Sequence, residues 1–279
     1  MALNQRFLQL MVWLKSEGHV AGRNVIEIGA QQLNDGFLKS TADIAQLCGL
    51  FGVAVPPLPP PQGAESDSRL VPAAPFARAF YEALGFEYSC IDVDNTPGAI
   101  PLDLNFENLP LHLRGRFDLI TNFGTTEHIA NQLNAFKIIH ELAAPGAIMI
   151  HELPTLGELN HGLINYQPKF FERLARGNAY DTLFFDFHWQ PVAFGLPDDL
   201  ESMMFRFVNL RGRPQYGVSA SAITTVMRKT ADAPFVPPLD IPGSAAVLES
   251  PPDDPLTLPS RFERATVAAG RRVLKFFRR

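Results

Sequence analysis

Short apolar segments alternate with amphipathic helical segments along the first 152 residues, and this alternation constrains the fold more than any other feature. Helical spacing of apolar residues occurs at 3–17, about 43–50, 76–84 and 127–142. The strand-like segments are 24–28, 88–93, 99–104, 117–123 and 147–150. Strands that alternate with helices in this way predict a mostly parallel sheet with helices on both faces.

Further elements are predicted beyond residue 152. The pattern predicts a helix at 169–176 and strands at 203–210 and 222–227, which would close the sheet. The aromatic-rich segment 183–189 is predicted to pack in the core, and lining of a substrate pocket is the alternative. Residues 1–230 are therefore predicted to form one α/β domain.

Proline-rich segments interrupt and follow this domain. Residues 51–74 include a run of prolines and predict a surface insertion, with a partner-binding PxxP segment as the alternative. Residues 231–260 hold eight prolines, five acidic residues and no basic residue, which predicts an extended linker. Residues 261–279 predict a basic amphipathic helix. This helix either contacts an anionic membrane surface or an acidic partner, or folds back onto the body; the sequence leaves both open.

Charge and cysteine content exclude several classes of protein. The net charge is −5, but the last 21 residues carry +6 and the rest of the chain −11. An acidic body argues against general nucleic-acid binding, which requires a basic surface. With 46% hydrophobic residues and only Cys48 and Cys90, neither whole-chain disorder nor a disulfide scaffold is expected.

The distribution of apolar residues bears on location. No apolar run approaches the length of a membrane span, and the N-terminal segment does not resemble a signal peptide. We therefore expect a cytoplasmic protein, with a peripheral contact at the inner membrane surface if the C-terminal helix binds lipid.

Polar residues at the strand ends are the candidates for ligand binding, because open parallel sheets bind ligands at the carboxyl ends of their strands. A glycine such as Gly29 lets the backbone approach a ligand, and free N–H groups there can bind a carboxylate. An acid at the end of the second strand can accept both hydroxyls of a ribose. The strand ends are 27–31, 92–94, 103–104, 122–124 and 151–152.

Six short motifs follow one another between residues 25 and 152. They are Val-Ile-Glu-Ile-Gly-Ala (25–30), Cys-Ile-Asp-Val-Asp (90–94), Leu-Asp-Leu (102–104), Phe-Asp-Leu-Ile-Thr-Asn-Phe (117–123), Thr-Glu-His-Ile (126–129) and Leu-Ala-Ala-Pro-Gly-Ala (142–147). In this order the series resembles the class I S-adenosylmethionine-dependent methyltransferases, and the segment around 126–147 resembles their small-molecule branch.

The resemblance implies a Rossmann-like, doubly wound α/β fold with a mostly parallel seven-stranded sheet, helices on both faces and an antiparallel last strand. It implies S-adenosylmethionine as the cofactor, bound by Glu27, Gly29, Ala30, Gln31, Asp92, Val93, Asp103, Leu104, Asn122, Phe123 and Gly124. The sequence departs from the family pattern at Gln31, which replaces the second glycine of the first motif. The spacing of 65 residues from Glu27 to Asp92 also exceeds the usual one, and the proline-rich segment and an extra helix account for the surplus if they form an insertion.

Several of these residues also have a purely structural interpretation. Glu27 could be a surface acid, but an acid inside an apolar strand must point outward or be paired, so a functional role is favoured for it and for Gly29. Asp92 and Asp94 both alternate with apolar residues. Asp92 is chosen for the ribose because the family's acid precedes an apolar residue. Asp103 is equally well explained as a turn residue.

Histidines are the candidate catalytic residues. His161 lies in a polar loop after the fifth strand and is predicted to be a general base, with His128 and His151 as alternatives. Asn165 and Tyr166 in the same loop are predicted to contact the substrate. A structural alternative for His128 is that it caps a helix together with its neighbour Glu127.

Other kinds of catalytic chemistry have little support. No metal-ligand spacing predicts a metal site, and assembly of His151, Glu152 and His161 into one is the less favoured alternative. The sequence has no Gly-x-Ser-x-Gly, and neither cysteine neighbours a charge that would activate it.

The predicted activity is S-adenosylmethionine-dependent methyl transfer to oxygen or nitrogen of a small molecule, such as a sugar or another metabolite. The alternative is an inactive methyltransferase-like binding or scaffold protein, which the replacement at Gln31 favours. A nicotinamide-dependent oxidoreductase is disfavoured, because residues 29–34 lack Gly-x-Gly-x-x-Gly.

Overall fold

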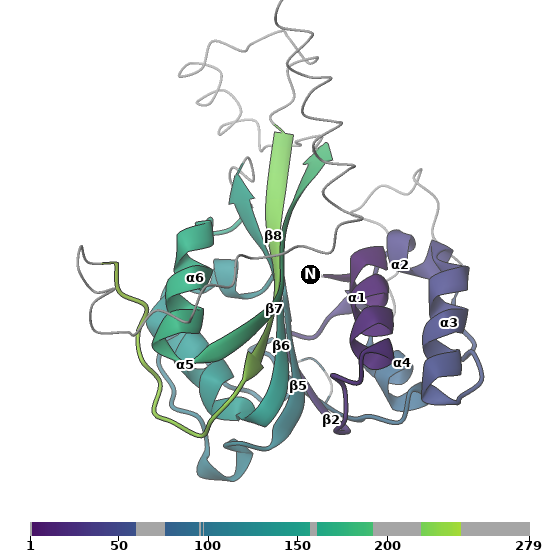
Figure 1. Ribbon diagram of the computed structural model, residues 1–279, viewed down its shortest axis with the longest axis horizontal. Coiled ribbons are helices and arrows are strands. Elements are labelled where there is room, and N and C mark those ends of the chain that lie inside the picture. Colours follow the sequence, from purple (N-terminus) through teal and green to yellow (C-terminus); the bar gives the residue numbers. More distant parts are fainter. Residues whose placement is uncertain are drawn as a thin grey trace, which may run out of the picture. The chain divides into compact units, whose positions relative to one another are not determined.

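Helices cover both faces of a central sheet in the structure, a computed structural model (Figure 1). The predicted segments 203–210 and 261–279, and most of 51–74 and 231–260, lie outside the described residues. Residues up to Pro238 belong to one compact unit. The structure describes residues 2–59, 76–94, 96, 98–156, 161–191 and 219–240.

The central sheet has the strand order β4-β2-β5-β6-β8-β7. Its strands are β2 (Asn24–Ile28), β4 (Glu87–Ile91), β5 (Phe117–Phe123), β6 (Ala143–Leu156), β7 (Tyr180–Pro191) and β8 (Ser219–Lys229). Neighbours from β4 to β6 are parallel, and β8 runs antiparallel to both β6 and β7. The predicted mostly parallel α/β sheet with an antiparallel last strand is therefore confirmed. The sheet has six strands among the described residues, so the predicted count of seven is not confirmed.

Two parts of the sheet differ from the sequence prediction. The predicted strand 99–104 is reduced to an isolated bridge between Ile100 and Ile91, because Pro101 has no N–H to continue a ladder. The aromatic-rich segment 183–189 lies within β7 and pairs with β8 from Phe184 onward, after a register shift between Thr182 and Phe184. Phe185 packs against the core on one face of the sheet and Phe184 against the core on the other, so this segment is a strand of the sheet.

The helices divide between the two faces of the sheet (Figure 1). On one face lie α1 (Gln5–Ser16), α2 (Asp35–Lys39), α3 (Thr41–Phe51) and α4 (Arg78–Ala83), and on the other α5 (Gln132–Leu142) and α6 (Pro168–Gly177). The helix α1 begins after Asn4, whose Oδ1 accepts the N–H of Phe7 at 3.2 Å. Its apolar side chains, spaced at helical intervals, are buried against the sheet.

The two cores follow the alternation of side chains along each strand. Val25 and Leu119 pack against the α1–α4 face, whereas Ile26 and Ile28 pack against the α5–α6 face. Glu27 lies between Ile26 and Ile28 and therefore projects toward the α1–α4 face. This places a carboxyl group inside a hydrophobic core.

A small second sheet and two 3-10 helices complete the described structure. The strands β1 (Ala2–Leu3) and β3 (Gln32–Leu33) pair in parallel. The 3-10 helices are η1 (Leu111–Leu113) and η2 (Thr126–His128). The predicted helix 127–142 is therefore split: His128 lies in η2, and α5 starts after Asn131, whose side chain accepts the N–H of Asn134.

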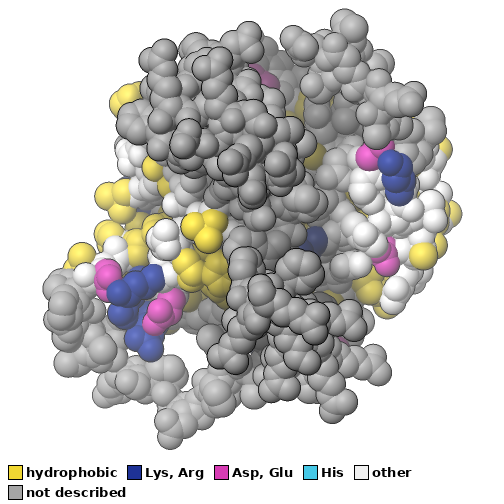
Figure 2. Space-filling model, turned by 90° about the horizontal axis from the view of Figure 1, so that it is seen from above, with side chains coloured by type: hydrophobic (Ala, Val, Ile, Leu, Met, Phe, Trp, Pro, Cys, Tyr) yellow, Lys and Arg dark blue, Asp and Glu magenta, His cyan; other side chains and the backbone are white. Residues whose placement is uncertain are grey.

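The described surface carries both signs of charge. On the face drawn in Figure 2, Lys and Arg side chains lie beside Asp and Glu side chains. Basic and acidic side chains also form ion pairs, such as Arg78 with Glu82 at 2.8 Å and Lys39 with Asp35 at 2.9 Å. Among the described residues, no helix is both long enough and apolar enough to cross a membrane.

Candidate active site

The carboxyl ends of four parallel strands meet at one edge of the sheet. The N–H of Gly29, after β2, donates to the carbonyl of Ile91 at the end of β4 at 2.8 Å. The N–H of Gly124, after β5, donates to the carbonyl of Glu152 in β6 at 3.1 Å. Most of the predicted site residues are therefore brought together at the edge where α/β folds bind ligands.

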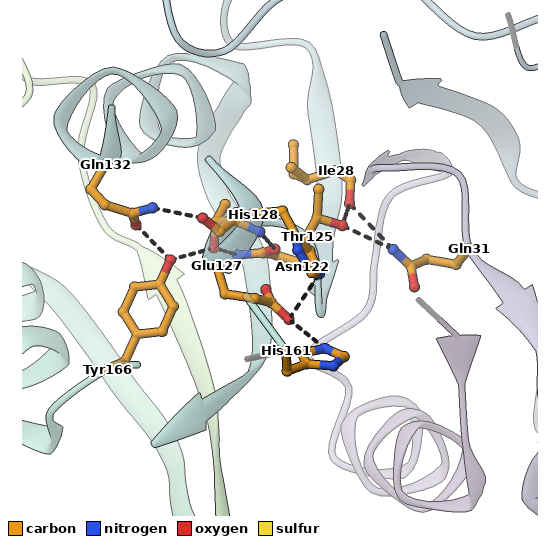
Figure 3. Close-up of polar contacts among 10 residues, drawn as sticks. Ile28, Gln31, Asn122, Thr125, Glu127, His128, Gln132, His161 and Tyr166 are labelled. Carbon is orange, nitrogen blue, oxygen red and sulfur yellow. Dashed lines mark hydrogen bonds and ion pairs between the residues drawn. The ribbon is translucent and has the colours of Figure 1, made fainter. Parts of the chain in front are cut away.

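Gln31 fills the position of the missing second glycine. Its side chain is fully buried, and Nε2 donates to the carbonyl oxygens of Gly29 at 3.1 Å and Ile28 at 3.3 Å (Figure 3). Nε2 also donates to Oγ1 of Thr125 at 3.2 Å, and that hydroxyl donates to the carbonyl of Ile28. Gln31 thus ties the turn after β2 to the loop after β5, and its Oε1 has no donor among the described residues.

Glu27 is buried and hydrogen-bonded rather than exposed. Its Oε2 accepts the Tyr88 hydroxyl at 2.7 Å and the N–H of Gln31 at 3.0 Å. Burial raises the pKa of Glu27 to about 7, although these two hydrogen bonds act in the opposite direction. Glu27 therefore stabilises the glycine turn through its hydrogen bond to the N–H of Gln31. Its direct contact with a cofactor stays a prediction.

Asp92 contacts the glycine turn directly, whereas Asp94 does not. Asp92 Oδ2 accepts the N–H of Ala30 at 2.9 Å, and its Oδ1 accepts the N–H of Asp94 at 3.2 Å. Asp94 bonds instead to Thr96 in its own loop. The intervening Val93 is 71% exposed, which leaves an apolar surface beside the acid. Of the two acids, Asp92 is the one that adjoins the turn after β2.

Asp103 forms a turn close to the same edge. Its Oδ1 accepts the N–H of Asn105 at 2.8 Å, which is the bonding expected of a turn residue. Asn105 in turn accepts the N–H groups of Ala130 and Asn131 at 3.1 Å each. Leu104 is buried in the core on the α5–α6 face. These contacts give Asp103 a structural role, and its contact with a cofactor stays a prediction.

Asn122 supports the loop after β5 from inside the protein. Its side chain is fully buried, and Nδ2 donates to Thr126 Oγ1 at 2.9 Å and lies 3.2 Å from Nδ1 of His151. Phe123 is also buried and its ring packs edge-on against Phe7. The side chains of Asn122 and Phe123 are therefore both inside the protein. The third predicted residue, Gly124, follows them with a backbone φ of +74°.

Glu127, His128 and His161 form a polar cluster beside this loop (Figure 3). Glu127 Oε1 lies 3.8 Å from Nε2 of His161 and 3.9 Å from Nε2 of His128. The glutamate is buried, whereas the two imidazoles are half-exposed. Burial, and in second place the nearby His161, lowers the pKa of His128. The predicted bases His128 and His161 thus stand together at the open edge.

His151 lies in the core. Its ring is 1% exposed and packs between Phe136 and Phe171 at centroid distances of 5.6 and 5.8 Å. Burial lowers its pKa to about 3, so the ring stays neutral at physiological pH. A base must reach the proton that it removes, and this position favours His161 or His128 over His151.

The two predicted substrate residues have different environments. Tyr166 is buried, and its hydroxyl lies 2.5 Å from Gln132 Oε1 and 2.8 Å from Thr126 Oγ1 (Figure 3). Asn165 is exposed. Tyr166 therefore links α5 to the turn η2, and Asn165 is the residue of the pair that is open to a ligand.

Sequence reasoning missed Thr125 and Gln132, and it named Glu152 only as a strand-end residue and an alternative metal ligand. Thr125, Gln132 and Glu152 all bond across the site, and Glu152 accepts from Nδ2 of Asn4 at 2.6 Å. Their partners are up to 148 residues away along the chain. The position of Glu152 next to His151 at the end of an apolar strand is the signal that made it a candidate.

A family model described as a methyltransferase domain matches residues 5–186 of this chain, which is more than half of its length. A glycine turn, an acid at the end of the next strand and this sheet order accompany that match. The chain belongs to the class I S-adenosylmethionine-dependent methyltransferases. It is a transferase, and S-adenosylmethionine is its cofactor.

Solved structures with a similar chain path share little sequence with this protein. The 1,6-didemethyltoxoflavin N1-methyltransferase of Burkholderia thailandensis is 11% identical, with 80% of this chain and 78% of that chain covered and a TM-score of 0.42. A SAM-dependent methyltransferase of Archaeoglobus fulgidus is 10% identical, with 79% and 93% covered and a TM-score of 0.37. The YcgJ protein of Bacillus subtilis is 14% identical, with 82% and 100% covered and a TM-score of 0.44.

With TM-scores this low, the family assignment rests on the match to the methyltransferase domain. No curated protein matches the chain in sequence.

The residues at the edge fit this cofactor. The partly exposed Asp92 carboxylate suits ribose hydroxyls, and the exposed Val93 suits an apolar ring face. The buried Gln31 Oε1, which has no donor among the described residues, suits the ammonium group of the methionine end. The glutamine side chain therefore supplies an acceptor where the family motif has a bare glycine.

Proposed function

We propose that this protein transfers the methyl group of S-adenosylmethionine to an oxygen or nitrogen atom of a small molecule, such as a sugar or another metabolite. The observation that carries the proposal is the meeting of two groups of residues at one edge of the sheet. The Gly29 turn bonds to Asp92 through Ala30 and to Thr125 through Gln31. Glu127 and His128 follow Thr125 directly in η2, and His161 joins them from a later loop, with its Nε2 3.8 Å from Glu127 Oε1.

Three parts of the chain would bind the cofactor. When bound, S-adenosylmethionine supplies a methyl group already activated on a sulfonium. Asp92 would accept the ribose hydroxyls, the Gly29 turn would let the backbone approach, and Gln31 Oε1 would accept from the ammonium. The main tasks left to the protein are to align the acceptor and to exclude water.

We propose that His161 is the general base that removes the proton from the acceptor, with His128 as the alternative. His161 is 52% exposed at its side chain, and the buried Glu127 lies 3.8 Å behind its Nε2. His161 is the more exposed of the two imidazoles, which lets it reach an acceptor bound at the open edge. Asn165, exposed in the same loop, is available to hydrogen-bond the acceptor.

Calorimetric titration of the full chain with S-adenosylmethionine and with S-adenosylhomocysteine tests the cofactor site. We expect both to bind, and we expect Asp92→Ala to weaken both by at least about tenfold, because it loses a charge-assisted hydrogen bond. Glu87→Ala, at the exposed start of the same strand, is the matched control. Equal affinities of wild type and Asp92→Ala would remove Asp92 from the site.

The role of His161 is tested with a methyl-acceptor screen followed by pH–rate profiles. His161→Ala should lower turnover and remove the acidic limb of the profile, whereas His112→Ala, an exposed histidine of η1, should change neither. An unchanged profile for His161→Ala would transfer the role to His128.

A second candidate function is that of an inactive methyltransferase-like binding protein. The observation that favours it is the buried Gln31 side chain at the position of a motif glycine. The same titration decides: absence of binding by either cofactor form in wild type would support this candidate and contradict methyl transfer.

The location of the protein is a separate proposal. We propose a cytoplasmic protein whose basic segment 261–279 contacts an anionic membrane surface, and the alternative is that this segment folds back. Sedimentation of full-length and 1–258 proteins with anionic vesicles tests this. Equal sedimentation of the two proteins would contradict the membrane contact.

A further inference from the structure

Three potential metal ligands converge beside the proposed cofactor site. The carboxylate of Glu127 and the imidazoles of His128 and His161 each offer one ligand atom, and these three atoms lie within 4.8 Å of one another. Glu127 Oε1 is 3.8 Å from His161 Nε2 and 3.9 Å from His128 Nε2. The two imidazole rings are tilted relative to each other, with their centroids 5.2 Å apart.

The backbone holds the two segments of this cluster together. The carbonyl oxygen of Glu127 accepts the N–H of Leu163 at 2.7 Å and that of Ile164 at 3.1 Å. Between His161 and Leu163, the backbone of Gly162 passes so close that a Cβ atom there would lie 2.8 Å from Glu127 Cγ. The relative position of His161 and Glu127 is therefore fixed by main-chain contacts, independently of the side chains that would bind an ion.

We propose that Glu127, His128 and His161 bind a divalent transition-metal ion such as Zn²⁺. An ion about 2.0–2.2 Å from each ligand holds its ligand atoms roughly 3–3.5 Å apart, so the half-exposed imidazoles need to move by only about an ångström. Two imidazoles and a carboxylate suit Zn²⁺ or Co²⁺, whereas Mg²⁺ and Ca²⁺ prefer oxygen ligands throughout.

Three protein ligands leave coordination positions open, as in catalytic rather than structural metal sites. The side chains of His128 and His161 are 42% and 52% exposed, so a further ligand can reach an ion held between them. Binding of the ion stands by itself, but its role rests on the proposed function. The ion binds the acceptor's oxygen or nitrogen and lowers its pKa. With the ion bound, His161 Nε2 is a ligand and does not act as a base.

Titration of untagged, EDTA-treated full-length protein tests the site, with Co²⁺ followed by its visible absorption and with Zn²⁺ and Mg²⁺ followed by calorimetry. We expect Zn²⁺ and Co²⁺ to bind and Mg²⁺ to bind far more weakly. His161→Ala and His128→Ala should each weaken Zn²⁺ binding by at least about tenfold, and His112→Ala should not. Equal Zn²⁺ affinity in wild type and in both cluster variants would overturn the proposal, as would no Zn²⁺ binding by wild type.

A variant that keeps all three ligands tests the geometry. Gly162→Ala should weaken Zn²⁺ binding, because the new Cβ would push Glu127 away from His161. Circular dichroism and S-adenosylmethionine binding serve as measures of folding for every variant. The two proposals fail separately: Zn²⁺ binding without S-adenosylmethionine binding contradicts methyl transfer alone, and the reverse contradicts the metal site alone.

Discussion

Individual buried groups with shifted pKa values give this protein two opposing responses to pH. Burial raises the pKa of Glu27 from 4.5 to about 7 and lowers that of His151 from 6.5 to about 3. Between pH 4.5 and 6.5, Glu27 is protonated in the folded protein and ionised in the unfolded chain. In the same range His151 is neutral in the folded protein and protonated in the unfolded chain. In this range the two contributions to stability largely cancel.

Glu27→Gln should separate one of these contributions. In wild type, the folded state binds more protons at Glu27 between pH 4.5 and about 7, so stability falls as pH rises, by about 1 kcal/mol per pH unit. The variant lacks this loss, and its stability relative to wild type should rise across the window and level off above it. Urea unfolding over this range measures the difference, and a constant difference would contradict the buried, protonated state of Glu27.

His151→Gln should reveal the opposite slope. The unfolded chain binds a proton at His151 below pH 6.5 and the folded protein does not until about pH 3. Wild type therefore loses about 1 kcal/mol per pH unit as the medium becomes more acidic, and the variant is spared this loss. Acid unfolding of wild type and of the variant, with His112→Gln as an exposed control, measures it. The same acid dependence in wild type and in His151→Gln would place the ring in contact with water.

At this scale the sequence predicted the need for partners but not their identity. The apolar neighbours of Glu27 in its strand required that it either point outward or be paired, and the structure pairs it with the hydroxyl of Tyr88. Tyr88 is 61 residues away, and only the parallel register of β2 with β4 brings it near. Local pattern cannot specify such a partner, because strand register depends on the whole sheet.

At the scale of the element, two glycines at the end of α3 have different reasons to be there. At both Gly49 and Gly52, the space that a Cβ atom would occupy is open, with no neighbouring atom within 4 Å, but only Gly52 has a left-handed backbone, with φ +70°. Gly49→Ala should stabilise the protein by about 0.5–1 kcal/mol, and Gly52→Ala should destabilise it by about 1 kcal/mol. Thermal unfolding of the pair measures both. Equal effects would show that available space rather than backbone conformation decides.

The junction of α5 with β6 depends on a buried lysine. Lys229, at the end of β8, donates to the carbonyl oxygens of His140 and Ala143 at 3.0 Å each, although burial lowers its pKa. Lys229→Met should cost about 1–3 kcal/mol, because it leaves both carbonyls without this donor. Arg228→Met, which removes a surface ion pair with Asp181, should cost less than about 1 kcal/mol. Equal losses in urea unfolding would contradict this capping role.

Elements whose apolar residues follow a regular pattern along the sequence were predicted well, and irregular elements were not. The strand 117–123 has the predicted bounds, and all but one of its side chains are buried. In β7 the pairing with β8 shifts between Thr182 and Phe184, and this irregularity breaks the period of two that identifies a strand. At η2 the side chain of Asn131 starts a new helix, so the apolar spacing of 127–142 spans two elements.

At the scale of the whole molecule, the N-terminal segment joins parts of the sheet that are distant in sequence. Asn4 caps α1 through one side-chain atom and donates to Glu152 through the other. Arg6 pairs with Asp186 of β7 at 2.8 Å. The chain start therefore contacts the carboxyl edge where the cofactor residues meet. A sequence pattern predicts the helix but cannot predict these long-range contacts.

Cofactor binding should be visible as a stabilisation of the whole molecule. A ligand that binds only the folded state at a hundred times its dissociation constant stabilises it by about 3 kcal/mol. The site joins turns after β2, β4 and β5, so this energy is shared by the whole compact unit rather than by one loop. S-adenosylmethionine should therefore raise the unfolding temperature of wild type and of Glu87→Ala, whereas Asp92→Ala should respond only at far higher cofactor concentration. A wild-type unfolding temperature that does not change with saturating cofactor would contradict a cofactor site built from these turns.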